Sequence, residues 1–356
     1  MTQLPPGATI GILGGGQLGR MLSVAAARLG YRCHIYEPGA APAADVAAAS
    51  TRAPYEDATA LEAFARAVDV VTFEFENVPA EALDRIEALR PLRPNHRALA
   101  VSQDRLTEKD FLSGLGLATA PYANVESRAD LDAALATIGP PAILKTRLLG
   151  YDGKGQVRIT AVDQAEEAFA AMAGAPALLE GFVDFSMEIS VIAARSTHGE
   201  VACFDPGRNH HEGGILRRTE VPAPIPAALR TDAVLLAGRI LNALDYVGVL
   251  GVELFVTPAG LVINEIAPRV HNSGHWTQNG CAVDQFEQHI RAIAGWPLGD
   301  GSRHANVTME NLIGEDMDRV PDLARDPDVA LHLYGKAETR PGRKMGHANR
   351  ISSVSG

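Results

Sequence analysis

The sequence contains no run of about 20 apolar residues, the length needed to cross the hydrocarbon core of a bilayer. Its first residues, MTQLPPGATIGIL, show neither a basic segment followed by an apolar one nor a cleavage site, so we expect no export signal. Hydrophobic residues make up 46% and charged residues 21% of the 356 residues. This balance predicts a globular chain that is not broadly disordered and has no membrane partner.

Cysteine is scarce, and basic residues are outnumbered by acidic ones. Cys33, Cys203 and Cys281 are odd in number, far apart and outside any metal-ligand spacing, which predicts buried free thiols in a reducing compartment. We therefore expect a cytoplasmic protein. The 43 acidic residues outnumber the 32 basic ones, and the net charge of −11 opposes binding to nucleic acid.

The length is enough for two or three lobes, because a single hydrophobic core stops growing at roughly 250 to 300 residues. Residues 8–100 alternate short apolar runs with helical patterns, which predicts a Rossmann-like α/β lobe over 1–98. Beyond that, strands with few helices between them predict antiparallel α+β structure over 99–300. We expect a small lid at 120–180 within this region, and a last subdomain over 301–356 that closes the substrate site.

A glycine-rich turn follows the first predicted strand. GILGGGQLGRM places Gly14, Gly16 and Gly19 in the spacing of a dinucleotide-binding fingerprint, and Glu37 ends the next predicted strand. A nicotinamide-dependent dehydrogenase is therefore one hypothesis. Glycines at such a turn also serve tight packing, and amides at a helix N-terminus bind many anions. We favour anion binding or packing, since nothing downstream resembles a hydride-transfer site.

Two glutamates are predicted to face each other across a hairpin in GVELFVTPAGLVINEI. A three-residue loop, Pro258-Ala259-Gly260, would pair Thr257 with Leu261 and so bring Glu253 opposite Glu265. Their Cβ atoms would lie roughly 4.5 to 5.5 Å apart, where like charges repel. The pair either relaxes into water or holds a cation. The apolar neighbours favour a cation, and carboxylate oxygens favour Mg²⁺ shared with nucleotide phosphates.

The stretch ILKTRLLGYDGKGQVRIT connects two predicted strands by a loop longer than a simple hairpin needs. Lys145 ends the first strand, and the glycines that follow allow backbone amides to approach a triphosphate, so we interpret the loop as a phosphate lid. These glycines are Gly150, Gly153 and Gly155. In LLEGFVDFSMEIS, Glu180 with the following backbone is a candidate for adenine and Glu188 for ribose hydroxyls; the alternative for either is a surface carboxylate.

The order of these features resembles that of the ATP-grasp ligases. More closely, GGGQLGRML, VTFEFENV, GYDGKGQ, NEIAPRVHNSGHWT and HLYGKAETRPGRKMGH are similar to the 5-(carboxyamino)imidazole ribonucleotide synthases of purine biosynthesis, over nearly the whole chain. The resemblance implies a three-lobed ATP-grasp fold, ATP as co-substrate and two Mg²⁺ ions, with Mn²⁺ as an alternative. Ala267 is a departure, because many ATP-grasp enzymes have a metal-binding asparagine there; Asn264 or water would substitute.

The resemblance implies a set of nucleotide and metal residues. Those that would bind ATP are Arg105, Lys145, Gly150, Tyr151, Asp152, Gly153, Lys154, Gly155, Gln156, Glu180, Gly181, Phe182, Val183, Glu188, His211, Asn264 and Glu265. Those that would bind the metal are Glu253 and Glu265. His211 lies in GRNHHEGGILRR, which we interpret as a polar loop outside the core.

The resemblance also implies a site for aminoimidazole ribonucleotide, next to the glycine turn, whose helix N-terminus would help to hold this substrate. The residues that would meet it are Gln17, Leu18, Glu74, Tyr151, Asp152, Arg269, Lys336, Arg343 and Lys344. A basic cluster in the tail is interrupted by RPGR, which excludes a regular helix, and we interpret it as a sugar-phosphate site. Its members are Lys336, Arg340, Arg343, Lys344 and His347. The alternative is a solvated run of charge.

The family joins bicarbonate to the exocyclic amine of aminoimidazole ribonucleotide while ATP is cleaved to ADP and phosphate. Phosphorylation of bicarbonate gives carboxyphosphate, which can release CO₂ beside the amine. The catalytic residues implied are Tyr151, Asp152, Lys154 and Lys336. Asp152 would orient the amine and accept its proton, unless it only shapes the turn. Lys154 would contact either carboxyphosphate or the γ-phosphate.

Other functions stay open at this point. A formate-dependent transformylase, a biotin carboxylase or a peptide-like ligase would share the fold, although GYDGKGQ and NEIAPRVHNSGH argue against them. A dehydrogenase would bind NAD(P)H without using ATP, and a nucleotide-sensing module would bind ATP without turnover. We expect ATP, bicarbonate and aminoimidazole ribonucleotide as ligands, and a homodimer formed through the first and last lobes.

Overall fold

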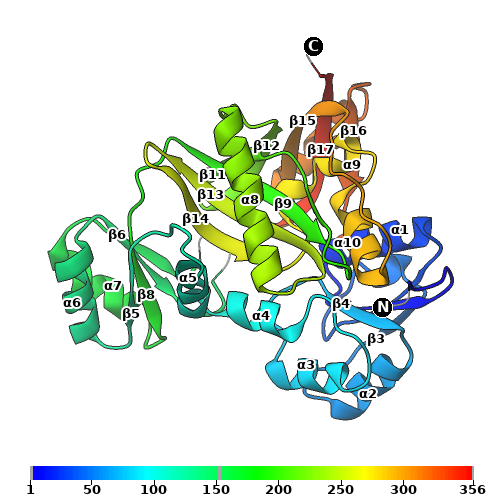
Figure 1. The fold of residues 1–356 in the computed structure, drawn as a ribbon, viewed down its shortest axis with the longest axis horizontal. Coiled ribbons are helices and arrows are strands. Elements are labelled where there is room, and N and C mark those ends of the chain that lie inside the picture. Colours follow the sequence, from blue (N-terminus) through cyan, green and yellow to red (C-terminus); the bar gives the residue numbers. More distant parts are fainter. Residues whose placement is uncertain (1–2, 151–153, 355–356) are drawn as a thin grey trace.

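The computed structural model describes residues 3–150 and 154–354, which form three β-sheets (Figure 1). One sheet is parallel and four-stranded, one is antiparallel and four-stranded, and the largest has nine strands. The predicted combination of a parallel α/β lobe, a small lobe and a larger antiparallel lobe is confirmed. Within the described ranges, no helix is both long enough and apolar enough to cross a membrane.

The parallel sheet forms the first lobe, with the strand order β3-β2-β1-β4. Its strands are β1 (Thr9–Leu13), β2 (Arg32–Tyr36), β3 (Ala49–Thr51) and β4 (Val70–Phe73). Its helices are α1 (Gln17–Arg28), η1 (Ala44–Val46), α2 (Ala58–Arg66), α3 (Ala80–Glu87) and α4 (His96–Gln103). Strands β1 and β4 are buried because apolar clusters cover both faces of the sheet. The turn from β1 to α1 therefore lies at the carboxyl edge, where such folds bind ligands.

The small antiparallel sheet has the order β5-β8-β6-β7 and lies at the left of Figure 1. Its strands are β5 (Tyr122–Val125), β6 (Ala142–Thr146), β7 (Gln156–Ile159) and β8 (Ala177–Gly181), and its helices are α6 (Arg128–Ile138), η2 (Val162–Gln164) and α7 (Ala165–Ala171). A capping box between Ser127 and Asp130 starts α6. Leu131 and Leu135 of this helix pack in one buried cluster with Leu144 of β6, which anchors the lobe.

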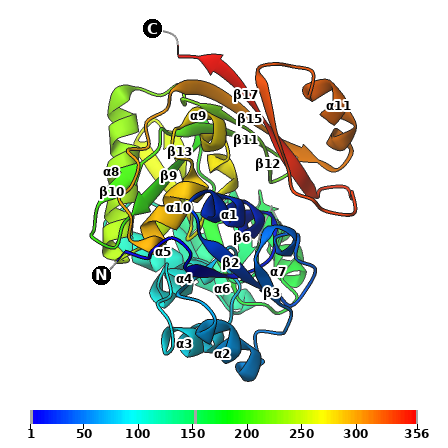
Figure 2. The same ribbon diagram turned by 90° about the vertical axis from the view of Figure 1, so that its right-hand side faces the viewer.

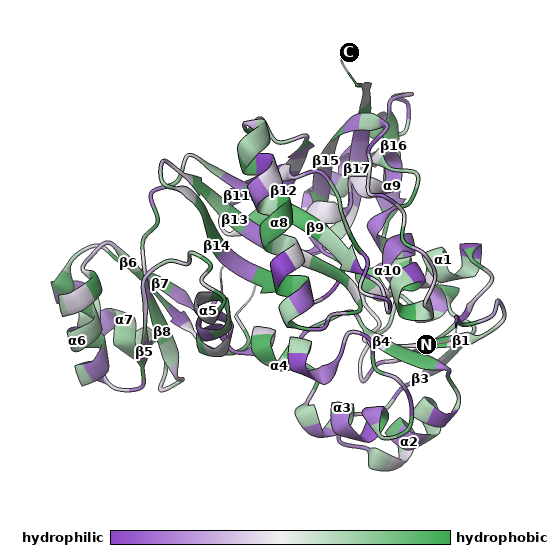
Figure 3. Cartoon of the chain, viewed as in Figure 1, coloured by the Kyte–Doolittle hydropathy of each residue, from purple (hydrophilic) through white to green (hydrophobic). Residues whose placement is uncertain are grey.

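The large sheet has the order β14-β13-β9-β11-β12-β15-β17-β16, with β10 added on β9. Its strands are β9 (Met187–Arg195), β10 (Val201–Cys203), β11 (Gly207–Glu212), β12 (Ile215–Val221), β13 (Gly248–Thr257), β14 (Gly260–Ala267), β15 (Ala305–Ile313), β16 (Val329–Leu333) and β17 (Lys344–Ser353). Its helices are α8 (Ala227–Ala243), η3 (Asn272–Gly274), α9 (Thr277–Gly280), α10 (Gln285–Ala294), η4 (Gly314–Arg319) and α11 (Val320–Leu323). The central strands β9 and β13 are mostly apolar (Figure 3).

The lobes are joined by shared packing. Helices α1 and α10 lie side by side (Figure 2), and one buried cluster combines Ile10 and Leu22 of the first lobe with Val249 and Phe286 of the large sheet and its helix. Helix α5 (Arg105–Gly114) lies between the small sheet and β14 (Figure 1). Strands β15, β16 and β17 continue the large sheet, so the last subdomain is not separate from it. The boundaries 1–98, 99–300 and 301–356 stay our proposal.

The three cysteine side chains are free thiols, as predicted. Cys33 and Cys281 are buried and Cys203 is half-buried. Burial raises the pKa of Cys33 and Cys203 to about 11 and that of Cys281 to about 12, so all three are protonated at neutral pH.

The tail differs from the predicted basic loop in one respect. His347 lies on β17 and is completely buried, where its ring stacks on His332 with centroids 4.5 Å apart and packs on His275 at 4.7 Å. The Tyr334 hydroxyl lies 2.8 Å from His347 Nδ1. Burial holds the pKa of His347 well below its usual value, so the ring is neutral. The assignment of His347 to the basic cluster is therefore wrong.

These stacked histidines should make the fold sensitive to acid. Burial lowers the pKa of His332 to about 4, against about 6.5 in an unfolded chain, so the unfolded state binds more protons once the pH falls below the higher value. Stability is therefore complete above about pH 6.5 and decreases toward about pH 4, by up to about 1.4 kcal/mol per pH unit for each such histidine. His332→Gln should make urea unfolding less dependent on pH in this range. If the parent protein and the variant lost the same free energy of unfolding between about pH 6.5 and about pH 4, His332 would not be a source of the acid sensitivity.

Candidate active site

The hairpin of β13 and β14 places Glu253 opposite Glu265, as predicted, but by a different route. The turn has two residues, because Thr257 pairs with Gly260 and not with Leu261. That register alone would shift the glutamates out of line. A β-bulge at Asn264 adds one residue to β14 between the pairs Leu254–Ile263 and Glu253–Glu265, and so restores their alignment.

Helix α5 supports the bulged strand with three charged side chains. Lys109 Nζ donates to the Asn264 carbonyl at 2.7 Å, and Arg105 Nη1 lies 3.2 Å from Glu265 Oε2. Glu108 Oε1 accepts a hydrogen bond from the Ile266 amide at 2.5 Å. A buried backbone group without a partner costs roughly 1 to 3 kcal/mol, so these contacts matter to a strand at the edge of the sheet.

The two opposed carboxylates differ in their electrostatic surroundings. Glu253 has 14% and Glu265 40% of its side chain exposed, so both border solvent-accessible space. Burial and the charge of Glu265 raise the pKa of Glu253 to about 7. Burial also opposes ionisation of Glu265, but Arg105 and then Lys145 outweigh it and lower the pKa. Two facing carboxylates with excess negative charge at Glu253 fit a hard divalent cation such as Mg²⁺.

A buried triad of charges joins the small sheet to this hairpin. Lys145 Nζ on β6 lies 2.9 Å from Glu180 Oε2 on β8, and Lys109 Nζ lies 3.7 Å from the same oxygen. Glu180 is 4% exposed, and burial alone would raise its pKa, but Lys145 and Lys109 lower it. The structure therefore uses this carboxylate to hold two lysines.

Glu188 on β9 and His211 on β11 form an ion pair at this site. His211 Nδ1 lies 2.6 Å from Glu188 Oε2. Burial opposes protonation of the imidazole, but Glu188 and the charge of Glu253 outweigh it and raise the pKa of His211. The predicted polar loop around His211 is wrong, because this residue lies on β11. The register between β11 and β12 shifts by one residue at this point, because Arg217 on β12 is an extra, unpaired residue between the pairs His210–Arg218 and His211–Leu216.

The lid is described in part. Lys145 pairs with Gln156 across β6 and β7, and the Gly155 carbonyl accepts a hydrogen bond from the Thr146 amide at 2.8 Å. A methyl group on Gly150 would lie 3.1 Å from Arg105, so the lid closely approaches this arginine, which contacts Glu265 of the hairpin. Lys154 begins the described part after the gap. The predicted Tyr151, Asp152 and Gly153 lie outside the described residues.

The segment after β8 packs against the small lobe. The Gly181 amide donates to the Pro121 carbonyl at 2.8 Å and the Phe182 amide to the Pro141 carbonyl at 3.0 Å. The Phe182 side chain is 39% exposed and lies under the guanidinium of Arg158, 4.6 Å from the ring centroid. Phe182 thus exposes an aromatic side chain directly after the end of β8, and its neighbour Val183 is half-buried.

The glycine turn is occupied by carboxylates of the protein itself. Glu74 accepts hydrogen bonds from the amides of Gly16 at 2.6 Å and Gly19 at 3.1 Å, and Glu37 accepts from Gly15 at 2.9 Å. A methyl group on Gly16 would lie 2.6 Å from Glu74 Oε1, which explains the glycine. Two carboxylates at these amides leave no place for a pyrophosphate, and this opposes the dehydrogenase hypothesis.

The first turn of α1 keeps further donors, namely the amides of Gln17 and Leu18. Burial raises the pKa of Glu74, although the amides of Gly16 and Gly19 and the charge of Arg269 act in the opposite direction.

Residues predicted for the ribonucleotide gather near Glu74. Arg269 follows β14 and its Nη2 lies 2.8 Å from Glu76 Oε1. Lys336 Nζ donates to the Lys344 carbonyl at 2.7 Å. Burial and then Arg343 lower the pKa of Lys336 to about 8, while the charge of Glu74 raises it.

The basic residues next to Lys336 have local partners. Arg343 Nη1 donates to the Glu338 carbonyl at 2.9 Å, and Arg340 pairs with the Glu338 carboxylate. Lys344 begins β17 instead of lying in the loop.

Sequence reasoning missed three residues at this site: Glu108, Lys109 and His271. His271 is half-buried, its Nε2 lies 3.6 Å from Glu253 Oε1, and desolvation holds its pKa well below the usual value. Composition carried a signal for Lys109. The chain has 27 arginines but five lysines, and the other four are Lys145, Lys154, Lys336 and Lys344, all predicted site residues.

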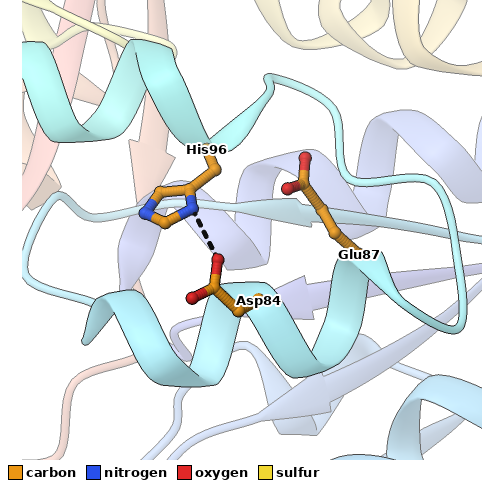
Figure 4. Close-up of side chains that lie close together, drawn as sticks. All are labelled: Asp84, Glu87 and His96. Atoms are coloured by element: carbon orange, nitrogen blue, oxygen red, sulfur yellow. Dashed lines mark ion pairs between the residues drawn. The ribbon is translucent and has the colours of Figure 1, made fainter.

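A separate group of possible metal ligands lies on the first lobe (Figure 4). Asp84 and Glu87 are one helical turn apart on α3, and His96 at the start of α4 has its Nδ1 3.0 Å from Asp84 Oδ1. Both carboxylates are exposed, and exposed acidic groups of this kind are common without an ion, so we assign no function to them.

Comparison with known proteins agrees with this geometry. Family models match residues 7–103 (ribonucleotide synthetase preATP-grasp domain), 110–286 (ATP-grasp domain) and 307–355 (phosphoribosylaminoimidazole carboxylase C-terminal domain). The chain is 55% identical to the N5-carboxyaminoimidazole ribonucleotide synthase of Brucella melitensis over 98% of each chain.

Two solved structures have nearly the same fold. The Staphylococcus aureus N5-carboxyaminoimidazole synthetase complexed with ADP is 35% identical, with a TM-score of 0.95 over 99% of this chain and 95% of that one. The Aspergillus clavatus enzyme in complex with ADP and 5-aminoimidazole ribonucleotide is 30% identical, with a TM-score of 0.92 over 98% and 95%. The chain belongs to the N5-carboxyaminoimidazole ribonucleotide synthase family, within the ATP-grasp fold.

Proposed function

We propose that this protein carboxylates the exocyclic amine of 5-aminoimidazole ribonucleotide with bicarbonate, at the expense of ATP. The observation that carries the proposal is the course of β14. Glu265 faces Glu253 in the hairpin, and four residues later Arg269 pairs with Glu76, in the segment that also carries Glu74. One strand end therefore joins a metal–nucleotide site to a site for a sugar phosphate.

The nucleotide would be held by basic side chains from three elements. Arg105 on α5, Lys145 on β6 and His211 on β11 would contact phosphate oxygens, while the segment Glu180 to Val183 would bind adenine and Glu188 the ribose. Glu253 and Glu265 would hold Mg²⁺, with Asn264 beside them, its Nδ2 3.5 Å from Glu253 Oε2. Mg²⁺ would neutralise charge on the transferred phosphoryl group.

The reaction needs a better leaving group than hydroxide on bicarbonate. A bicarbonate oxygen attacks the γ-phosphorus of ATP, ADP departs, and carboxyphosphate forms. Carboxyphosphate then breaks its C–O bond to phosphate and delivers CO₂ to the amine nitrogen, which loses one proton. The chain's contribution is to position the reactants and exclude water beneath the lid, and Asp152 accepts the proton.

The ribonucleotide would lie between the first lobe and the tail. Lys336, Arg343 and Lys344 supply positive charge for its phosphate, and the amides of Gln17 and Leu18 supply further donors. The lowered pKa of Lys336 supports this role, since an ammonium held beside other cations gains from a bound anion. Tyr151 and Lys154 complete the set at the lid.

The remaining parts of the proposal follow from the family resemblance. They are a second metal ion, Mn²⁺ as a substitute for Mg²⁺, a homodimer formed through the first and last lobes, and a cytoplasmic location, which the three free thiols support.

The substrate assignment predicts that ADP release from Mg-ATP and bicarbonate depends on 5-aminoimidazole ribonucleotide. A coupled assay for ADP, run with and without the ribonucleotide, measures this directly. Protein that binds Mg-ATP but releases ADP equally in both mixtures would contradict the substrate. Stabilisation by NADH but not by ATP in a thermal melt would contradict the whole class.

The metal assignment predicts that Glu253→Gln and Glu265→Gln raise the Mg²⁺ concentration needed for ADP binding. Loss of a partner of a metal ligand costs about 10- to 100-fold in affinity, and loss of a ligand should cost at least as much. Glu310→Gln, the same change elsewhere in the large sheet, is the matched control. Calorimetric titration of ADP at several Mg²⁺ concentrations tests this. If ADP affinity depends on Mg²⁺ in the same way in the parent protein and in all three variants, the hairpin is not the metal site.

The proton-transfer assignment predicts that Asp152→Asn loses turnover while it binds ATP almost normally. A general base contributes about 10²- to 10⁴-fold to the rate, whereas a residue that only shapes the turn contributes little to the chemical step. Steady-state kcat and a separate ATP titration distinguish the two. Near-normal kcat in the variant would assign Asp152 to the turn alone.

A further inference from the structure

The face of α5 that meets β14 supports three consecutive residues of that strand. Arg105, Glu108 and Lys109 are three and four positions apart, so they point from the same side of the helix. Lys109 reaches the backbone of Asn264, Arg105 the side chain of Glu265, and Glu108 the backbone of Ile266. Each of three consecutive residues of β14, in the hairpin that carries Glu253 and Glu265, is thus contacted by a different side chain of α5.

Lys109 contacts β14 at the position where this strand is least regular. Strand β14 is the outermost strand of the large sheet, and its Ile263 amide pairs with the Ala118 carbonyl at 2.8 Å. The next residue, Asn264, is the bulged one, and its carbonyl accepts the hydrogen bond from Lys109. A bulge re-aims the side chains beside it, so this contact determines where Glu265 points.

The same ammonium also contacts the small sheet. Lys109 Nζ lies 3.7 Å from Glu180 Oε2, the oxygen that Lys145 Nζ approaches at 2.9 Å. Lys109 is 1% exposed and therefore cannot contact a phosphate directly. It joins the carboxylate that orients Lys145 to the backbone that orients Glu265, across the boundary between two sheets.

We propose that Lys109 is a positioning residue of the metal–nucleotide site. It holds the Asn264 bulge so that Glu265 faces Glu253, and it holds Glu180 so that Lys145 extends toward the phosphates. This inference rests on the proposed function, since it assumes that the hairpin binds a metal and Lys145 a nucleotide. Lys109 itself touches neither the metal nor the nucleotide, but its loss should weaken the binding of both.

The experiment compares Lys109→Met with Asp110→Asn. Methionine keeps most of the volume of lysine without its charge or donors, whereas Asp110, the next residue of α5, accepts a hydrogen bond from the Tyr122 hydroxyl at 2.7 Å instead of facing β14. Each protein is titrated with ADP by calorimetry, once with Mg²⁺ and once with EDTA. The ratio of the two dissociation constants measures the metal-dependent gain in affinity.

In Lys109→Met the metal-dependent gain should fall by about 10-fold or more, as for residues that orient metal ligands, and ADP binding in EDTA should also weaken. Asp110→Asn should match the parent protein in both. A purely structural role would lower the melting temperature of Lys109→Met but leave the ratio unchanged in the folded protein. A folded variant with the parent's ratio would therefore overturn the proposal.

Two further outcomes are also decisive. If Lys109→Met does not fold, Lys109→Gln takes its place. Glutamine keeps an N–H donor for the Asn264 carbonyl but removes the charge near Glu180, so ADP binding in EDTA should weaken, and an unchanged affinity in EDTA overturns the role. If the parent protein itself binds ADP equally with and without Mg²⁺, the proposed metal site fails. ADP affinity in EDTA then tests Lys109 through Lys145 alone, and an unchanged value overturns the role.

Discussion

The carboxylates of the hairpin formed by β13 and β14 need positive charge nearby, and the elements around the site supply it. Glu253 and Glu265 face each other, and an uncompensated charge in a confined space costs several kcal/mol. Helix α5 therefore brings Arg105 to Glu265, and β6 brings Lys145 to Glu180. Glu253 faces Glu265 and His271; burial and then the charge of Glu265 raise its pKa to about 7, while His211 acts in the opposite direction.

Lysine and arginine make different contacts in this part of the structure. Arginine needs room for a planar fork, as at Arg147, whose Nε and Nη2 lie 3.0 and 2.5 Å from the two oxygens of Asp104. Lysine presents a compact charge, and Lys109 uses it in an almost fully buried position between one carbonyl and one carboxylate.

Much of the fold follows from local patterns, since alternating strands and helices predict the parallel lobe and successive strands predict the antiparallel one. The facing glutamates were predicted correctly from a wrong turn, because two deviations cancel: a loop one residue shorter and a bulge at Asn264. Neither is visible in the sequence. The bulge at Arg217, opposite His211, and the burial of His347 were missed for the same reason, because strand pairing and stacking depend on distant residues.

The glycine turn illustrates how one backbone geometry supports different chemistry. Its amides bind anions in any fold, but here Glu74 is the anion, supplied by the neighbouring strand end. A fixed carboxylate attracts cations, and its charge acts on both Arg269 and Lys336. A turn that elsewhere holds pyrophosphate thus holds a carboxylate here, with Arg269 and Lys336 in its electrostatic surroundings. The change depends on one residue after β4, so the glycine motif alone does not identify the ligand.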